Sequence, residues 1–300
     1  MSLGFLSEGE LFSLGCALIW AVGVILFRVS GQRIEPIALN LFKNLVGLVL
    51  FFITLPLVGV SFYPEGTTPT DLLTLAISGI VGIGIADSLF FASLNRLGAG
   101  NTAIVDSLYS PFVILCAFVY LQESISSAVL VAMLIMTAAI LVGTWDPSLP
   151  SEPQSRKQIT VGVALGVLGM FLMAVGLVIA KPVLEHAQAW WVTTMRLVAG
   201  TAFIAIQGLL PRHRASVLAI LRPSRHWRVA VPAGIIGCYL AMITWIAGLK
   251  LTLASIASIL NQTSTLFVVL LAAIFLKEKV TLRKGAAVAM AFVGAVLVTW

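Results

Sequence analysis

Charged residues are scarce in this sequence: Asp, Glu, Lys and Arg make up only 10% of its 300 residues, whereas 60% are hydrophobic. A soluble domain carries about a quarter charged residues, so this chain has too little polar surface to face water. The mean hydropathy is +1.07, and the apolar runs of roughly 20 residues match a hydrocarbon core of about 30 Å. They lack the alternation of an outer-membrane barrel. The sequence therefore predicts an all-α polytopic membrane protein.

Motifs for metal binding and catalysis are also missing. The three cysteines lie inside apolar runs without CxxC spacing, and the three histidines lie in loops. We therefore expect no disulfide framework, no metal and no other cofactor. The absence of an HExxH motif and of a phosphate-binding loop argues against an enzyme and against direct use of ATP. The net charge of +6 comes from short loops between apolar runs, which is typical of membrane topology rather than of nucleic-acid binding.

Breaks at Gly, Pro and charged residues divide the chain into ten predicted spans. They cover residues 11–29, 36–59, 71–95, 98–121, 125–145, 159–181, 188–210, 227–249, 253–276 and 281–300. The Pro- and Ser-rich stretch 146–158 reads as an irregular connector at the midpoint. We therefore expect a first five-helix repeat over 1–145, a linker over 146–158 and a second five-helix repeat over 159–300.

The two halves resemble each other at fixed offsets. Residues 79–145 align with 234–300 at an offset of 155, so Asp106 corresponds to Asn261. The earlier portions align at 153, so Lys43 corresponds to Arg196. Because five spans is an odd number, the second copy would enter the membrane from the opposite side. Inverted repeats around a central cavity are typical of secondary transporters that work by alternating access, and they argue against a channel built from identical subunits.

Two matching segments follow this offset, "SPFVILCAFVYLQESIS" at 110–126 and "TLFVVLLAAIFLKEKVT" at 265–281. With five-plus-five spans, the chain resembles the EamA-type branch of the drug/metabolite transporter superfamily, which is marked by a proline early in the fourth and ninth spans and a glutamate at their ends. Leu266 replaces the second proline, which predicts a straighter ninth span. Glu123 and Glu278 end these spans, where we expect them to cap the backbone N–H groups that open spans five and ten.

The resemblance implies a bacterial inner-membrane exporter of aromatic or neutral amino acids. Alternatives are an exporter of other small solutes or drugs, or a lipid-type flippase. Members of this branch are commonly drawn with cytoplasmic termini, but the loop charges predict otherwise. Of the Lys and Arg residues in or beside the loops, only Lys181 and Lys250 belong to even-numbered loops. Because basic residues favour the cytoplasmic side, this predicts odd-numbered loops in the cytoplasm and both termini in the periplasm. The expected partners are an amino-acid substrate and the lipid bilayer, with no nucleic acid, and the chain is expected to act as a monomer.

Four charged residues lie well inside predicted spans, away from the span ends, where such groups are a functional hypothesis. They are Lys43, Asp87, Asp106 and Arg196. Counted from the span ends, the first three lie at a similar depth below the cytoplasmic surface, and Arg196 lies towards the opposite surface near Asn261. Lys43 would pair with Asp87 or Asp106, either as a merely structural ion pair or as a cytoplasmic gate that opens when substrate replaces a partner.

Polar and aromatic side chains at mid-span depth are the expected cavity lining. The candidates are Trp20, Asn44, Tyr109, Met195, Tyr239, Asn261 and Gln262. Amides can bind a zwitterionic head group without the desolvation cost of full charges, and aromatic rings suit large neutral side chains. Residues 11–27 contain no carboxylate, which disfavours cationic-drug antiport on the scheme of the small multidrug exporters.

Overall fold

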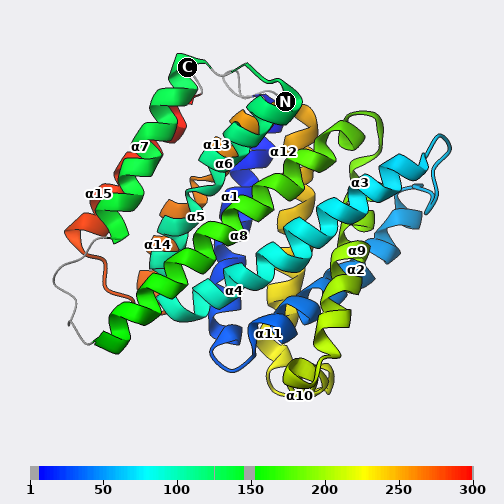
Figure 1. Cartoon of the computed structure of the whole chain (residues 1–300), viewed down its shortest axis with the longest axis horizontal. Coiled ribbons are helices and arrows are strands. Elements are labelled where there is room, and N and C mark those ends of the chain that lie inside the picture. Colours follow the sequence, from blue (N-terminus) through cyan, green and yellow to red (C-terminus); the bar gives the residue numbers. More distant parts are fainter. Residues whose placement is uncertain (1–6, 125, 145–152, 299–300) are drawn as a thin grey trace.

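The computed structural model describes residues 7–124, 126–144 and 153–298, and every regular element in these ranges is helical (Figure 1). The segments in chain order are α1 Glu8–Gly31, α2 Pro36–Leu57, α3 Pro69–Gly79, η1 Ile80–Ile85, α4 Ala86–Leu97, α5 Ala99–Asp106, α6 Tyr109–Cys116, η2 Ala117–Leu121, α7 Ser127–Thr144, α8 Pro153–His186, α9 Ala189–Gly208, α10 Pro211–Leu221, α11 Trp227–Ala233, η3 Gly234–Leu240, α12 Ala241–Leu251, α13 Ala254–Asn261, α14 Ser264–Phe275 and α15 Leu282–Val298. The η segments are π-helical turns that continue the helices around them.

Within these described ranges, eight helices are long and apolar enough to cross a membrane, and they confirm an all-helical polytopic architecture. They correspond to predicted spans one to four and six to nine. The predicted fifth and tenth spans fall on α7 and α15, which pack side by side at one edge (Figure 1). The exact count of ten spans stays a prediction. Residues 153–158 of the expected linker belong to α8, which begins at Pro153; residues 145–152 lie outside the described ranges, and the domain bounds stay a prediction.

Two equivalent glycine contacts between the repeats follow the same offsets and allow helix backbones to approach closely. A Cβ added at Gly23 of α1 would lie 2.8 Å from Cα of Gly237 in η3. A Cβ added at Gly176 of α8 would lie 2.7 Å from Cα of Gly82 in η1. Each crossing joins the first span of one repeat to the third span of the other, as in an inverted arrangement. Only glycine permits this separation, because any side chain would meet backbone atoms.

The fourth and ninth spans are both broken, at equivalent positions. The break after α5 follows Asp106, and the break after α13 follows Asn261. The straighter ninth span predicted from Leu266 is therefore wrong. In both copies the turn is built from i→i−3 bonds, in which Ser107 N donates to Ile104 O and Gln262 N donates to Ile259 O. Such bonds tighten the chain without a proline.

Both glutamates at these span ends act as caps, but on a different helix from the one expected. Glu278 accepts from the backbone nitrogens of Ala99 and Gly100 at 3.0 Å each, and Glu123 accepts from Ala254 N at 3.3 Å. Those groups open the fourth and ninth spans, and the caps expected at spans five and ten stay a prediction. Each carboxylate caps the equivalent helix of the other repeat and so ties the repeats together.

A second pair of equivalent residues caps the C-terminal ends of the third and eighth spans. Arg28 donates through Nη1 to the carbonyls of Leu94 and Asn95 at 2.9 and 3.0 Å, near the end of α4. Its counterpart Lys181 donates to the carbonyl of Leu249 and to that of Thr252, at the end of α12. A cation at a helix C-terminus satisfies carbonyls that have no partner within the helix and complements the helix dipole.

Candidate functional site

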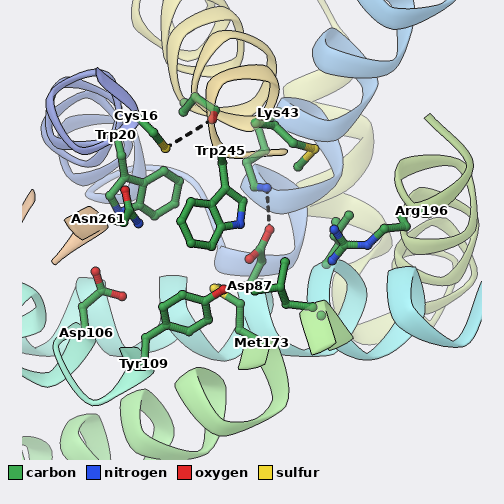
Figure 2. Close-up of a pocket in the computed structure, with 16 residues that line it drawn as sticks. Cys16, Trp20, Lys43, Asp87, Asp106, Tyr109, Met173, Arg196, Trp245 and Asn261 are labelled. Atoms are coloured by element: carbon green, nitrogen blue, oxygen red, sulfur yellow. Dashed lines mark hydrogen bonds and ion pairs between the residues drawn. The ribbon is translucent and has the colours of Figure 1, made fainter. Parts of the chain in front are cut away.

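A cavity of about 110 Å³ lies between the two repeats and is lined by residues from both. A water needs about 10–15 Å³ by the same kind of measure, so the space suits a small solute of roughly ten non-hydrogen atoms. Four charged side chains line it, namely Lys43, Asp87, Asp106 and Arg196. Figure 2 shows Lys43, Asp87 and Arg196 towards one side, Asp106 and Asn261 towards the other, and aromatic rings between them.

Lys43 and Asp87 form a buried ion pair. Nζ of Lys43 lies 2.6 Å from Oδ2 of Asp87, and the two residues are only 3% and 8% exposed. Lys43 also donates to Oδ1 of Asn44 at 2.9 Å and lies over the ring of Phe91. Of the two acidic partners that the sequence left open for Lys43, the structure places Asp87 at the ion pair and not Asp106.

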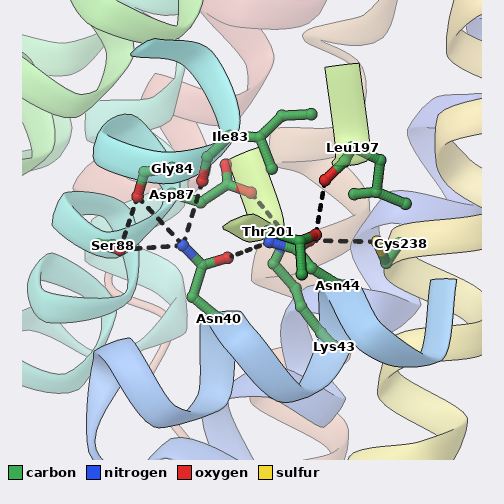
Figure 3. A network of polar contacts seen from close by, with 10 residues as sticks. All are labelled: Asn40, Lys43, Asn44, Ile83, Gly84, Asp87, Ser88, Leu197, Thr201 and Cys238. Carbon is green, nitrogen blue, oxygen red and sulfur yellow. Dashed lines mark hydrogen bonds and ion pairs between the residues drawn. The ribbon is translucent and has the colours of Figure 1, made fainter. Parts of the chain in front are cut away.

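An amide network links Lys43 to the π-helical turn that precedes Asp87 (Figure 3). The π-helical turn η1 ends at Ile85, just before Asp87, and such turns leave carbonyls without their usual helical donors. Asn40 Nδ2 donates to Ile83 O at 3.1 Å, and Asn44 Nδ2 donates to Asn40 Oδ1 at 3.0 Å. Asn44, predicted to line the cavity, instead lies fully buried beneath Lys43 and holds its ammonium. Asn40 is not among the site residues predicted from the sequence.

Arg196 faces the same cavity as Lys43, which corrects its predicted placement near the opposite surface. Its Nε donates to Oγ of Ser78 at 2.7 Å, and Ser78 in turn donates to the carbonyl of Gly176. The residue is 6% exposed. Among the described residues, no carboxylate oxygen lies within 4.0 Å of its nitrogens. Arg196 is therefore a buried cation held in place by a neutral partner.

Asp106 and Asn261 form the other polar side of the cavity (Figure 2). The side chain of Trp20 lies close to that of Asp106. Within the described part of the chain, Oδ1 of Asn261 and Oε1 of Gln262 are buried acceptors without a donor. Gln262, expected in the lining, lies 2% exposed behind it and donates through Nε2 to the backbone carbonyl of Asp106 at 3.4 Å.

Three large aromatic residues line the cavity: Trp20, Tyr109 and Trp245. The rings of Tyr109 and Trp245 lie 6.1 Å apart between centroids. Trp245 escaped the sequence analysis, although it follows Phe90 by the repeat offset of 155, and Phe90 packs against Trp20 at 5.8 Å. The repeat could therefore have pointed to it.

Two of the candidate lining residues lie elsewhere. Tyr239 is 2.5 Å from Thr54 between hydroxyl oxygens and packs on Phe51, so its polar tip is already satisfied. Met195 packs against the hydrophobic core, and the methionine in the lining is Met173. Met173 corresponds to Trp20 at the offset of 153.

Comparisons with known proteins agree with this architecture. The model of the EamA-like transporter family matches residues 7–145 and 160–300. This chain belongs to the EamA-like transporter family. As a family member it is a multi-pass membrane transporter of small solutes.

Individual relatives are more distant. The chain is 26% identical to "Protein PecM" of Dickeya dadantii (strain 3937) over 209 residues, which are 69% of this chain and 67% of that protein. It is 23% identical to an "Uncharacterized transporter" of Archaeoglobus fulgidus (strain ATCC 49558 / DSM 4304 / JCM 9628 / NBRC 100126 / VC-16) over 274 residues, 91% of each. A solved crystal structure that is 17% identical superposes with a TM-score of 0.75, covering 97% of this chain and 96% of the other, which shows the shared fold.

Proposed function

We propose that this transporter exports amino acids, preferably aromatic and neutral ones, by alternating access across a bacterial inner membrane. The observation that carries the proposal is one small cavity that combines opposite charges with aromatic rings. Asp106, Arg196 and the Lys43–Asp87 pair offer partners for both ends of a zwitterion. Trp20, Tyr109 and Trp245 offer apolar faces for a large side chain.

The size and charge balance of the cavity support the same solute class. About 110 Å³ suits one amino acid, whereas a nucleotide sugar is several times larger. The lining carries two cations and two anions, so a zwitterion can find an opposite charge for each of its two charged groups.

The direction of transport and the orientation rest on the sequence. Export follows from the resemblance to amino-acid exporters, and the loop charges favour odd-numbered loops in the cytoplasm. Glu123 and Glu278 carry out a capping role at span ends, so in this proposal they do not carry protons. Alternating access would move the equivalent helices of the two inverted repeats in opposite senses around the cavity.

Purified protein in liposomes tests the proposal directly. Vesicles are loaded with labelled phenylalanine, leucine, glutamate or lysine, and efflux is followed with and without a pH gradient. We expect saturable efflux of phenylalanine and leucine that exceeds efflux of glutamate and lysine and is absent from protein-free vesicles. No saturable flux of any amino acid would refute the substrate class. Flux of a fluorescent phospholipid in place of amino acids would identify a flippase instead.

A further inference from the structure

The two repeats differ in charge at one pair of equivalent positions in the cavity. Lys43 corresponds to Arg196 at the offset of 153, and Asp87 corresponds to Met242 at the offset of 155. All four residues line the cavity. In the first repeat the cation has its acidic partner 2.6 Å away. In the second repeat the cation is present, but a methionine stands where the partner would be.

Arg196 is consequently a buried guanidinium whose terminal nitrogens find no hydrogen-bond acceptor in the described part of the chain. Its Nε is engaged by Ser78 Oγ, and its terminal nitrogens have no carboxylate within 4.0 Å among the described residues. Asp87 lies near enough to influence Arg196 electrostatically, but its Oδ2 is held by Lys43. A guanidinium offers two parallel N–H groups that match a carboxylate, and a buried cation without a counter-charge is unfavourable.

We propose that Arg196 is the anchor for a carboxylate on the substrate, and that Met242 sets this specificity by leaving the anchor without an internal partner. The substrate class is then a small monocarboxylate whose apolar part lies against Trp20, Tyr109 and Trp245. That the bound carboxylate belongs to an amino acid rests on the proposed function. The anchor itself does not, because any small carboxylate would satisfy Arg196. A bound α-ammonium next to that carboxylate would face Asp87, which Figure 2 shows below Lys43 and to the left of Arg196.

Two substitutions test the anchor from opposite directions. Arg196→Gln removes the cation, whereas Met242→Glu keeps it and gives it an internal carboxylate at the position equivalent to Asp87. Met195→Leu is the matched control, because Met195 is next to Arg196 on α9 and does not line the cavity. Binding is read from tryptophan fluorescence, since Trp20 and Trp245 line the cavity.

Three ligands of similar shape separate the charged groups: phenylalanine, 3-phenylpropionate and phenethylamine. The wild type and Met195→Leu should bind the two carboxylates more tightly than the amine. Arg196→Gln and Met242→Glu should each weaken binding of both carboxylates by about 10- to 100-fold, as expected for a charge-assisted hydrogen-bonded pair, and leave phenethylamine binding at the wild-type level. Met242→Glu keeps the test valid if Arg196→Gln fails to fold, because it retains every native hydrogen bond of Arg196.

The outcomes separate this inference from the proposed function. Carboxylate selectivity that survives both substitutions overturns the anchor, even if amino acids are still transported. If 3-phenylpropionate binds in an Arg196-dependent way and no amino acid binds or is transported, the anchor stands and the amino-acid proposal fails. Equal loss of all three ligands in folded Met242→Glu also overturns the anchor, because the substitution would then act by filling the cavity.

Discussion

The ion pair between Lys43 and Asp87 makes a quantitative prediction about stability. Both residues are buried and their charged atoms lie 2.6 Å apart. Removing one partner leaves the other charge uncompensated, which costs about 3–5 kcal/mol, whereas replacing both with apolar residues of similar size is often close to neutral. Methionine is the natural replacement, because Met242 already occupies the position equivalent to Asp87. We therefore expect Lys43→Met and Asp87→Met each to destabilise the protein strongly.

The double variant Lys43→Met/Asp87→Met should recover most of that loss. The residual cost comes from Asn44, whose Oδ1 loses the Lys43 donor at 2.9 Å and keeps only the thiol of Cys238 at 3.4 Å. One weakened buried hydrogen bond costs about 1 kcal/mol. The wild type is thus expected to be the most stable. The double variant should lie about 1 kcal/mol below the wild type, and each single variant about 3–5 kcal/mol below the wild type.

Equilibrium unfolding in mixed detergent micelles measures all four proteins as a double-mutant cycle. Single variants within 1 kcal/mol of the wild type would refute the reasoning, since a buried unpaired charge would then be tolerated. A double variant as unstable as the sum of the singles would refute it as well, because the two charges would then not be coupled.

The same double variant decides between the two roles left open for this pair. If the pair is only structural, liposomes with the double variant should transport substrate at the wild-type rate. If the pair is a gate, transport should fall although stability is recovered, because an apolar pair cannot exchange partners with the substrate. Wild-type transport by the double variant excludes the gate.

Three further predictions concern the frame and the aromatic wall. Gly23→Ala should lower thermal stability by about 1–3 kcal/mol, because its Cβ would lie 2.8 Å from Cα of Gly237; Gly15→Ala in the same helix, with nothing within 4 Å, should not. Glu278→Gln should cost about 1 kcal/mol in the same unfolding assay, since an amide has one acceptor oxygen for two N–H groups, and unchanged stability would contradict the cap. Trp245→Leu should raise KM for phenylalanine efflux by about 3- to 10-fold, and a rise as large for alanine would contradict an aromatic subsite.

The repeat offsets are what made much of the fold predictable. They come directly from the sequence, and the structure bears them out in the Gly23–Gly237 and Gly176–Gly82 crossings. Apolar runs also gave the eight membrane-length helices with small errors at their ends. The break in the ninth span was not predicted, because Leu266 stands where the fourth span has Pro111. The break depends instead on backbone bonds at Gln262 that a local motif does not record.

The site was harder to predict, for reasons that are geometric. Counting residues from the span ends predicted Arg196 at a different depth from Lys43. Such a count assumes straight helices and ignores how the helices are arranged side by side. In the structure the two side chains meet in the cavity from α9 and α2. Glu278 was assigned to the next helix in sequence, whereas its carboxylate reaches α5 of the other repeat. Contacts between distant segments decide both cases.

A comparison of equivalent residues explains how a duplicated chain can recognise an asymmetric solute. Positions that build the frame keep their chemistry in both copies, as Glu123 and Glu278 do at the helix caps. Positions in the cavity differ, as Asp106 differs from Asn261 and Asp87 from Met242. A cavity with true two-fold symmetry would offer the same charges to both ends of its ligand. An amino acid has one carboxylate and one side chain, so its binding in a single orientation requires a cavity lining that is not symmetric. The helices that move can keep the symmetry of the two repeats.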